Sequence, residues 1–135
     1  MALRLDGGGS RLISPAATDP TYSPDGLKIA LIRADPVSPT TDLFVVNADG
    51  TGLTQLTYTR AIEQHPSWDF TGQGLAYERL RSGNSEAASL GFGDALMEIN
   101  ADASCQTKVL SLHETALLSP IWQPGPGREA GSIAC

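Results

Sequence analysis

Short runs of apolar residues separated by turn residues are the dominant pattern along this chain. Runs rich in Ile, Val, Leu, Phe and Tyr alternate with turn sequences such as Pro-Asp-Gly at residues 24–26 and Asp-Gly at residues 49–50. Proline fixes one backbone dihedral and glycine accepts a positive φ, so these sequences favour tight turns between strands. The pattern therefore predicts an all-β fold built from short antiparallel strands.

The apolar runs also place the individual strands. They predict eight, at about residues 20–23, 28–33, 42–47, 53–57, 66–70, 75–80, 95–100 and 107–111. Residues 42–47 are apolar at both odd and even positions, so we expect both faces of that strand to be covered by other parts of the protein.

The same order of strands and turns occurs twice. Pro20 and Pro66 lie 46 residues apart, and Asp49 and Asp102 lie 53 residues apart, close to the length of about 40–50 residues that is typical of propeller blades. Four strands in a repeated meander describe a blade, so we predict a β-propeller fragment made of four-stranded antiparallel blades. A β-sandwich or barrel is the alternative, but it does not require the same prolines and turns to recur in order.

Partial copies of the unit stand at both ends. Asp6 lies 43 residues before Asp49 within a similar hairpin sequence, and residues 120–124 resemble residues 20–24. We therefore interpret residues 1–135 as a single propeller segment with four parts: an outer hairpin of a preceding blade (1–14), blade one (15–60), blade two (61–112), and the start of a third blade with a C-terminal tail (113–135).

About three blades are too few for a closed ring, which needs four to eight. Either the chain is a piece of a longer propeller, or copies associate as a homo-oligomer. In the second case each chain supplies half of a six-bladed ring, and the N-terminal hairpin of one copy completes the last blade of another.

Charge and composition limit the classes of partner that we expect. The net charge is −6, and the nine Lys and Arg residues are scattered, which disfavours nucleic acid as a partner. An acidic surface keeps a protein soluble, and it can also dock a basic partner. No apolar run is long enough for membrane insertion, and the sequence from Met1 lacks the features of a signal peptide.

Catalytic and metal-binding patterns are weak. The nearest match to a nucleophile elbow, residues 83–87, lacks the second glycine and lies in a polar stretch. The two histidines and two cysteines do not have zinc-ligand spacing, and Asp25, Asp49 and Asp102 stand a blade apart, as turn formers do. We expect no enzyme activity, no metal and no cofactor.

Three polar residues are candidates for partner binding. Asp19 and His65 each precede a proline at the start of the predicted innermost strand, near the mouth of a propeller channel, and Glu63 lies close by in sequence. They could form a polar rim that contacts a ligand or partner, or they could cap backbone groups, as Asp side chains often do. The Gly- and Ser-rich loop at about 81–93 is a further candidate contact surface.

Aromatic residues and cysteines raise two more questions. Tyr22, Trp68 and Trp122 occupy one repeat position, which indicates packing between blades more than a sugar platform. Cys105 and Cys135 are a possible disulfide pair, and such a bond would stabilise the fold by roughly 3–4 kcal/mol and indicate an oxidising compartment.

The clearest unit resembles a known family. Pro-x-Tyr-Ser-Pro-Asp-Gly-x-Lys-Ile-Ala at 20–30, followed by the sequence of residues 42–57, is similar to the WD40-like (PD40-type) repeat of TolB-like propellers. The similarity covers roughly residues 3–124, although the second unit departs from it at 69–72.

This resemblance implies a six-bladed propeller, periplasmic or secreted, that binds other proteins or acts as a gating domain. The expected function is thus a non-enzymatic module for protein–protein interaction or scaffolding. The alternative is an accessory or gating propeller of a larger enzyme, such as a serine peptidase or a carbohydrate-active protein.

Overall fold

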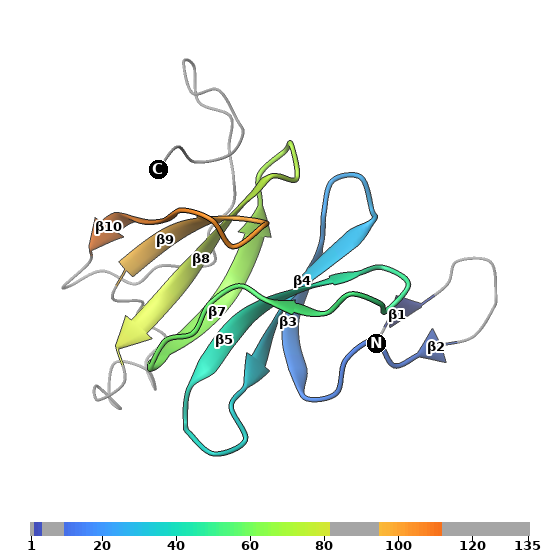
Figure 1. Ribbon diagram of the computed structural model, residues 1–135, viewed down its shortest axis with the longest axis horizontal. Helices are drawn as coiled ribbons and strands as arrows, with labels where there is room; N and C mark the ends of the chain where they lie inside the picture. Colours follow the sequence, from blue (N-terminus) through green and yellow to red (C-terminus); the bar gives the residue numbers. More distant parts are fainter. Residues whose placement is uncertain (1, 4–9, 82–94, 112–135) are drawn as a thin grey trace.

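The structure is a computed structural model, and it describes residues 2–3, 10–81 and 95–111. Within these ranges all regular elements are β-strands, which confirms the predicted all-β class. A short N-terminal hairpin is followed by two meanders of four strands each (Figure 1). The predicted loop at 81–93, apart from its first residue, and the third unit at 113–135 lie outside the described residues.

The strands follow the predicted order closely. The hairpin consists of β1 (Ala2–Leu3) and β2 (Ser10–Arg11). The first meander contains β3 (Ala17–Tyr22), β4 (Lys28–Ala34), β5 (Thr41–Asn47) and β6 (Thr54–Gln55). The second contains β7 (Ala61–Trp68), β8 (Gly74–Arg81), β9 (Ala95–Asn100) and β10 (Gln106–Ser111).

Each meander is an antiparallel sheet in which consecutive strands pair. We call the sheet β3–β6 blade one and the sheet β7–β10 blade two. A single parallel pair, Thr41 with Ile62, connects the two sheets, and β7 also packs against β3 and β4. The two blades therefore lie side by side with their first strands adjacent (Figure 1).

The main hydrophobic core lies between the blades. Blade one contributes Ala30, Ile32, Leu43, Val45 and Leu56, and blade two contributes Trp68, Leu75, Tyr77, Ala95, Met97 and Ile99. A second cluster, made of Ile29, Leu31 and Val46, covers the opposite face of blade one. Strand β5 thus contributes side chains to both clusters, as its apolar sequence on both faces predicted.

The turns repeat in detail between the blades. Gly26 and Gly72 have φ values of 72° and 73°, and their amides donate to the carbonyls of Ser23 and Asp69 at 2.8 and 3.2 Å. The turn of blade two therefore keeps the shape of the blade-one turn although its sequence is Phe-Thr-Gly in place of Pro-Asp-Gly. A positive φ is the shared requirement, and glycine meets it at both positions.

The outer turns show the same equivalence. Gly50 and Ala103 both have positive φ. The side chains of Asp49 and Asp102 each accept a hydrogen bond at 2.9 Å from the backbone N–H of the residue two positions later. These acids therefore act as turn formers, as their spacing predicted.

The N-terminal hairpin repeats the outer strands of blade one. Its register pairs Ala2 with Arg11. Adding the 43-residue offset to both positions gives Val45 with Thr54, which is the register observed between β5 and β6. The hairpin therefore has the geometry of the two outer strands of a blade that precedes blade one.

The first strand of each blade begins earlier than predicted. We predicted that the first strands begin at about 20 and 66, next to the prolines, but β3 begins at Ala17 and β7 at Ala61. Each strand contains a register shift at the proline, so the chain pairs on both sides of it. A β-bulge accommodates the missing N–H of proline without ending the strand.

Trp68 should carry much of the packing between the blades. It is 7% exposed, and its Nε1 donates to the carbonyl of Thr21 at 3.0 Å. We predict that Trp68→Ala lowers the free energy of unfolding by about 3–5 kcal/mol. Phe70→Ala, at a side chain that is 58% exposed, should lower it by less than about 1 kcal/mol. Urea denaturation measures both, and equal effects would contradict this packing.

Candidate functional site

A strained residue stands before the proline in the first strand of each blade. Asp19 has φ of 48° and His65 has φ of 52°, values that non-glycine residues rarely adopt. Both lie at the β-bulges of β3 and β7, 46 residues apart. Because the two blades repeat this conformation, the bulge is a fixed part of the unit and sets the direction of these two side chains.

Asp19 binds the neighbouring blade. Its Oδ2 accepts a hydrogen bond from the backbone N–H of His65 at 3.0 Å. The sequence left open whether Asp19 forms a binding rim or caps a backbone group. The structure shows that it caps one, and that the capped group belongs to blade two and is distant in sequence.

His65 directs its ring toward a buried acid on β8. The Nδ1 of His65 lies 3.2 Å from Oε2 of Glu78, and Nε2 of Gln64 donates to the same oxygen at 3.0 Å. The Glu78 side chain is fully buried, whereas the His65 side chain is 39% exposed. The other carboxylate oxygen of Glu78, Oε1, has no hydrogen-bond partner among the described residues.

We call Asp19, Gln64, His65 and Glu78 the inner-strand cluster. Sequence reasoning found Asp19 and His65 but missed Glu78, because it lies in an apolar run that predicts a core strand. Aligning the two units would have indicated it. Glu78 is 46 residues after Ile32, which is 2% exposed and belongs to the core between the blades.

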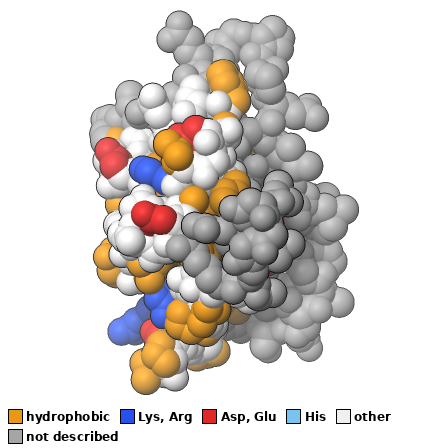
Figure 2. All heavy atoms as spheres, turned by 90° about the vertical axis from the view of Figure 1, so that its right-hand side faces the viewer, with side chains coloured by type: hydrophobic (Ala, Val, Ile, Leu, Met, Phe, Trp, Pro, Cys, Tyr) orange, Lys and Arg blue, Asp and Glu red, His pale blue; other side chains and the backbone are white. Residues whose placement is uncertain are grey.

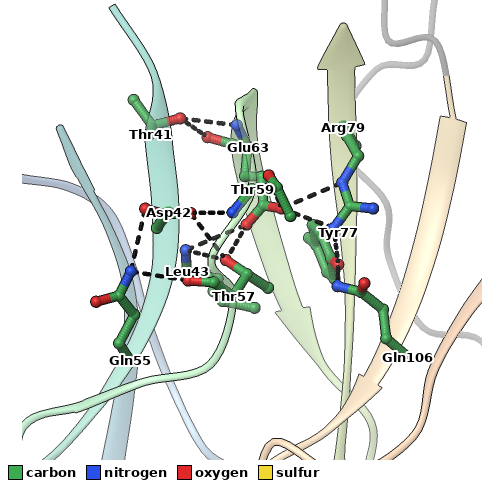
Figure 3. A network of polar contacts seen from close by, with 10 residues as sticks. All are labelled: Thr41, Asp42, Leu43, Gln55, Thr57, Thr59, Glu63, Tyr77, Arg79 and Gln106. Atoms are coloured by element: carbon green, nitrogen blue, oxygen red, sulfur yellow. Dashed lines mark hydrogen bonds and ion pairs between the residues drawn. The ribbon is translucent and has the colours of Figure 1, made fainter. Parts of the chain in front are cut away.

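Glu63 lies elsewhere, in a polar network between the blades (Figure 3). Its carboxylate accepts hydrogen bonds from the hydroxyls of Thr57 and Thr59 and from the backbone N–H of Leu43 at 3.2 Å. Arg79 adds an ion pair at 2.8 Å. The Glu63 side chain has no exposed surface, so the structure does not present it on an open rim with Asp19 and His65.

The network extends into both sheets. The hydroxyl of Thr41 accepts from the backbone N–H of Glu63 at 2.7 Å and donates to its carbonyl at 2.6 Å, next to the parallel bridge between the sheets. On the other side, Arg79 donates to the hydroxyl of Tyr77 at 3.0 Å, and Gln106 also donates to it (Figure 3). Strands β5, β7, β8 and β10 are thereby joined.

Burial dominates the electrostatics of this network. It raises the pKa of the Glu63 carboxyl above its ordinary value, and the hydrogen bonds from Thr57 and Arg79 oppose that rise. Burial likewise raises the pKa of the Tyr77 hydroxyl, with the negative charge of Glu63 adding to the effect. The groups of this network are buried and hydrogen-bonded to one another, which suits a structural role.

Most of the remaining predicted sites lie outside the described residues. Cys105 is disulfide-bonded, but Cys135, its predicted partner, lies outside the described residues. So do the hydrolase-like residues 83–87 and Trp122. Among the described residues no three His, Cys, Asp or Glu side chains gather in a way that could hold a metal ion. The same residues contain no helix long and apolar enough to cross a membrane.

Comparisons with known proteins identify the fold. No protein-family model and no curated protein sequence match this chain. A solved structure of a TolB protein from Agrobacterium tumefaciens matches 71% of this chain and 34% of its own length, with a TM-score of 0.58 and 16% identity. An oligogalacturonate lyase in complex with manganese matches 91% of this chain and 30% of its own, with a TM-score of 0.60 and 19% identity.

These likenesses show the fold that the repeat predicted. The described strands form part of a TolB-like β-propeller, and the chain spans about a third of the length of the two structures it matches. At identities below one in five the likeness extends to the fold alone, since unrelated functions share one architecture.

The raised pKa of Glu63 predicts a pH dependence of stability. Because the folded state binds this proton more tightly than the unfolded state, Glu63 contributes to the free energy of unfolding below its ordinary pKa of 4.5. That contribution is lost as the pH rises through the folded pKa. Urea denaturation across this range should show that Glu63→Gln removes this part of the slope.

The difference between the pH profiles of the wild type and Glu63→Gln gives the contribution of Glu63 alone. Asp25 and Asp102 have pKa values lowered by hydrogen bonds from Ser23 and Ser104, so they contribute with the opposite sign, but they are common to both proteins. Identical pH profiles for wild type and Glu63→Gln would contradict the assignment.

Proposed function

We propose that this chain, which has the fold of a TolB-like β-propeller segment, is a non-enzymatic module that binds another protein through its inner-strand cluster. The blades would act as a rigid frame that fixes the position of a few polar side chains, and those side chains would select the partner.

One observation carries this proposal: the buried carboxylate of Glu78 has an oxygen without a hydrogen-bond partner among the described residues. A buried acceptor left unsatisfied costs about 1–3 kcal/mol, and more when the group is charged. The fold does not require an acid here, because Ile32 fills the equivalent position of blade one. A costly residue at a position where an apolar one suffices indicates a role in binding.

The chemistry of the cluster indicates the kind of partner group. An ionised carboxylate only accepts hydrogen bonds, and Oε2 of Glu78 already accepts from Gln64. The free position therefore favours a donor, and a cationic donor makes the stronger bond. Arginine fits best, because its planar guanidinium can bond the carboxylate and still reach a second acceptor. The net charge of −6 would attract a basic partner.

His65 provides the approach to this position. Its side chain is 39% exposed while its Nδ1 lies 3.2 Å from Glu78, so the ring connects the surface with the buried acid. We propose that a side chain of the partner enters beside this ring. The lyase among the comparisons does not argue for catalysis here, because a shared fold at 19% identity does not transfer its activity.

We also propose a periplasmic or extracellular location. The disulfide bond at Cys105 supports it, because such bonds persist in oxidising compartments. The expected result is that protein isolated from its natural compartment, alkylated without reductant, gains no alkyl group, and that prior reduction adds two. Intact-mass spectrometry reads this out, and two alkyl groups without reduction would overturn the proposal.

An NMR titration tests the function. Titrating ¹⁵N-labelled protein with N-acetyl-arginine amide should shift the side-chain amide signals of Gln64 and the signals of His65. Glu78→Ile, which installs the residue of blade one, should keep the fold and weaken the binding by about tenfold or more because the charge-assisted bond is lost. Asp102→Asn removes the same charge at an exposed turn and should leave binding unchanged.

The uncharged analogue N-acetyl-citrulline amide is the matched ligand control. It has nearly the shape of the arginine probe but no positive charge, so it should bind weakly. Equal binding of the two probes, or undiminished binding by Glu78→Ile, would reject the proposed role of Glu78.

A further inference from the structure

The face of blade one that points away from blade two has the chemistry of a blade interface. Tyr22 occupies the repeat position of Trp68, but Tyr22 is 52% exposed and Trp68 only 7%. Trp68 is buried because blade one packs against it and accepts the hydrogen bond of its indole. Tyr22 is exposed because the equivalent support is missing from the described part of the chain.

Two neighbouring residues on this face, Ile29 and Leu31, are only 3% and 2% exposed, but they too occupy repeat positions that form the interface between the blades. Ile29 and Leu31 of β4 correspond to Leu75 and Tyr77 of β8, which pack against blade one. A shallow groove of about 100 Å³ runs beside Tyr22 and is lined by Ile13, Ser14, Ala17, Pro20, Ile29 and Leu31. Figure 2 views the molecule from the side on which β1 and β2 lie and shows hydrophobic side chains that reach the surface there.

Part of a preceding blade is already in place. Ile13 packs against the cluster of Ile29, Leu31 and Val46. Its equivalent 43 residues later, Leu56, packs in the same way against blade two. Together with the shared register of the hairpins β1–β2 and β5–β6, this shows that the N-terminal hairpin takes the place of the outer strands of a blade.

The N-terminal hairpin thus supplies only the outer half of a preceding blade. A complete blade would add two inner strands equivalent to β3 and β4. These strands would bring apolar side chains like Ala30 and Ile32, and a backbone carbonyl like that of Thr21. A helix or an isolated peptide would not satisfy both requirements, so the face fits a pair of antiparallel strands.

We propose that residues 113–135 of a second copy of this chain fill this place. Residues 120–124, Pro-Ile-Trp-Gln-Pro, repeat residues 20–24, and Ser132-Ile133-Ala134 resembles the start of β4. The segment thus has the sequence of the two inner strands. Residues 1–135 supply about three blades, and a closed ring has four to eight, so we place this segment beside the hairpin of another copy.

In a pair of copies, the N-terminal hairpin and the C-terminal segment of each chain both find a partner. The hairpin of each copy pairs with the inner strands of the other, and the result is a two-fold ring of six blades. Each Tyr22 is then covered by a blade, as Trp68 is covered now. This interface lies on different residues from Glu78, so a failure here leaves the proposed arginine binding untouched.

Light scattering with size-exclusion chromatography over a dilution series tests the assembly. The wild-type protein should show twice the chain mass of 14.2 kDa and dissociate on dilution. Tyr22→Asp places a charge in the interface at a side chain that is exposed in the single chain, so it should fold normally and be a monomer. Phe70→Asp, at a side chain 58% exposed outside the proposed face, should remain a dimer.

A photocrosslink identifies the occupant. A benzoyl-phenylalanine at position 22 should crosslink to residues 113–135, and mixing ¹⁴N- and ¹⁵N-labelled chains should show by mass spectrometry that the two ends of the crosslink come from different copies. A monomer at every concentration, a dimer that survives Tyr22→Asp, or crosslinks confined to one chain would each overturn the proposed docking. A wild-type monomer would indicate that a preceding blade of a longer polypeptide covers this face.

Discussion

The structure depends on the need of each blade to bury both of its faces. A four-stranded sheet with apolar side chains on both sides is unstable alone, because one face would remain in water. In β5 the side chains of Leu43 and Val45 face blade two, while Val46 belongs to the cluster on the other face. Stacking blades around an axis meets this requirement, and the repeat makes each contact resemble the next.

Polar contacts fix the position of one blade against the other. Hydrophobic packing is not directional, so it does not set the register between two sheets. The hydrogen bond from His65 to Asp19 and the indole hydrogen bond from Trp68 to Thr21 each join one residue of blade two to one residue of blade one. The Glu63 network joins the blades through several hydrogen bonds. Their fixed geometry turns two meanders into one frame. The same frame holds Glu78 beside His65.

The sequence was sufficient for the fold because the fold is periodic. Alternating apolar residues and glycines with positive φ place the strands and turns locally, and Pro20 and Pro66 show the repeat. The bulges at Asp19 and His65 could not be predicted, because they arise from pairing between strands. Glu63 was placed on the rim because sequence spacing does not reveal which face of β7 a residue occupies at a bulge, where the alternation of side chains breaks.

Glu78 was missed although the strand that contains it was predicted correctly. Its neighbours predict a core strand, and the strand is there, so the acid is visible only when it is compared with Ile32 in the other unit. The exposure of Tyr22 was also unexpected, since its repeat position predicts a buried aromatic. In both cases the departure of one unit from the other is the informative observation, because a repeat supplies its own reference.

Hydrogen exchange of the Trp68 indole N–H tests the stacking of the two blades most directly. This group is buried, and its only acceptor among the described residues is the Thr21 carbonyl of the adjacent blade. If the blades stack as described, the indole proton should exchange only at the slow rate set by global unfolding. Exchange at the rate of an indole in open solvent would show that the blades do not pack face to face.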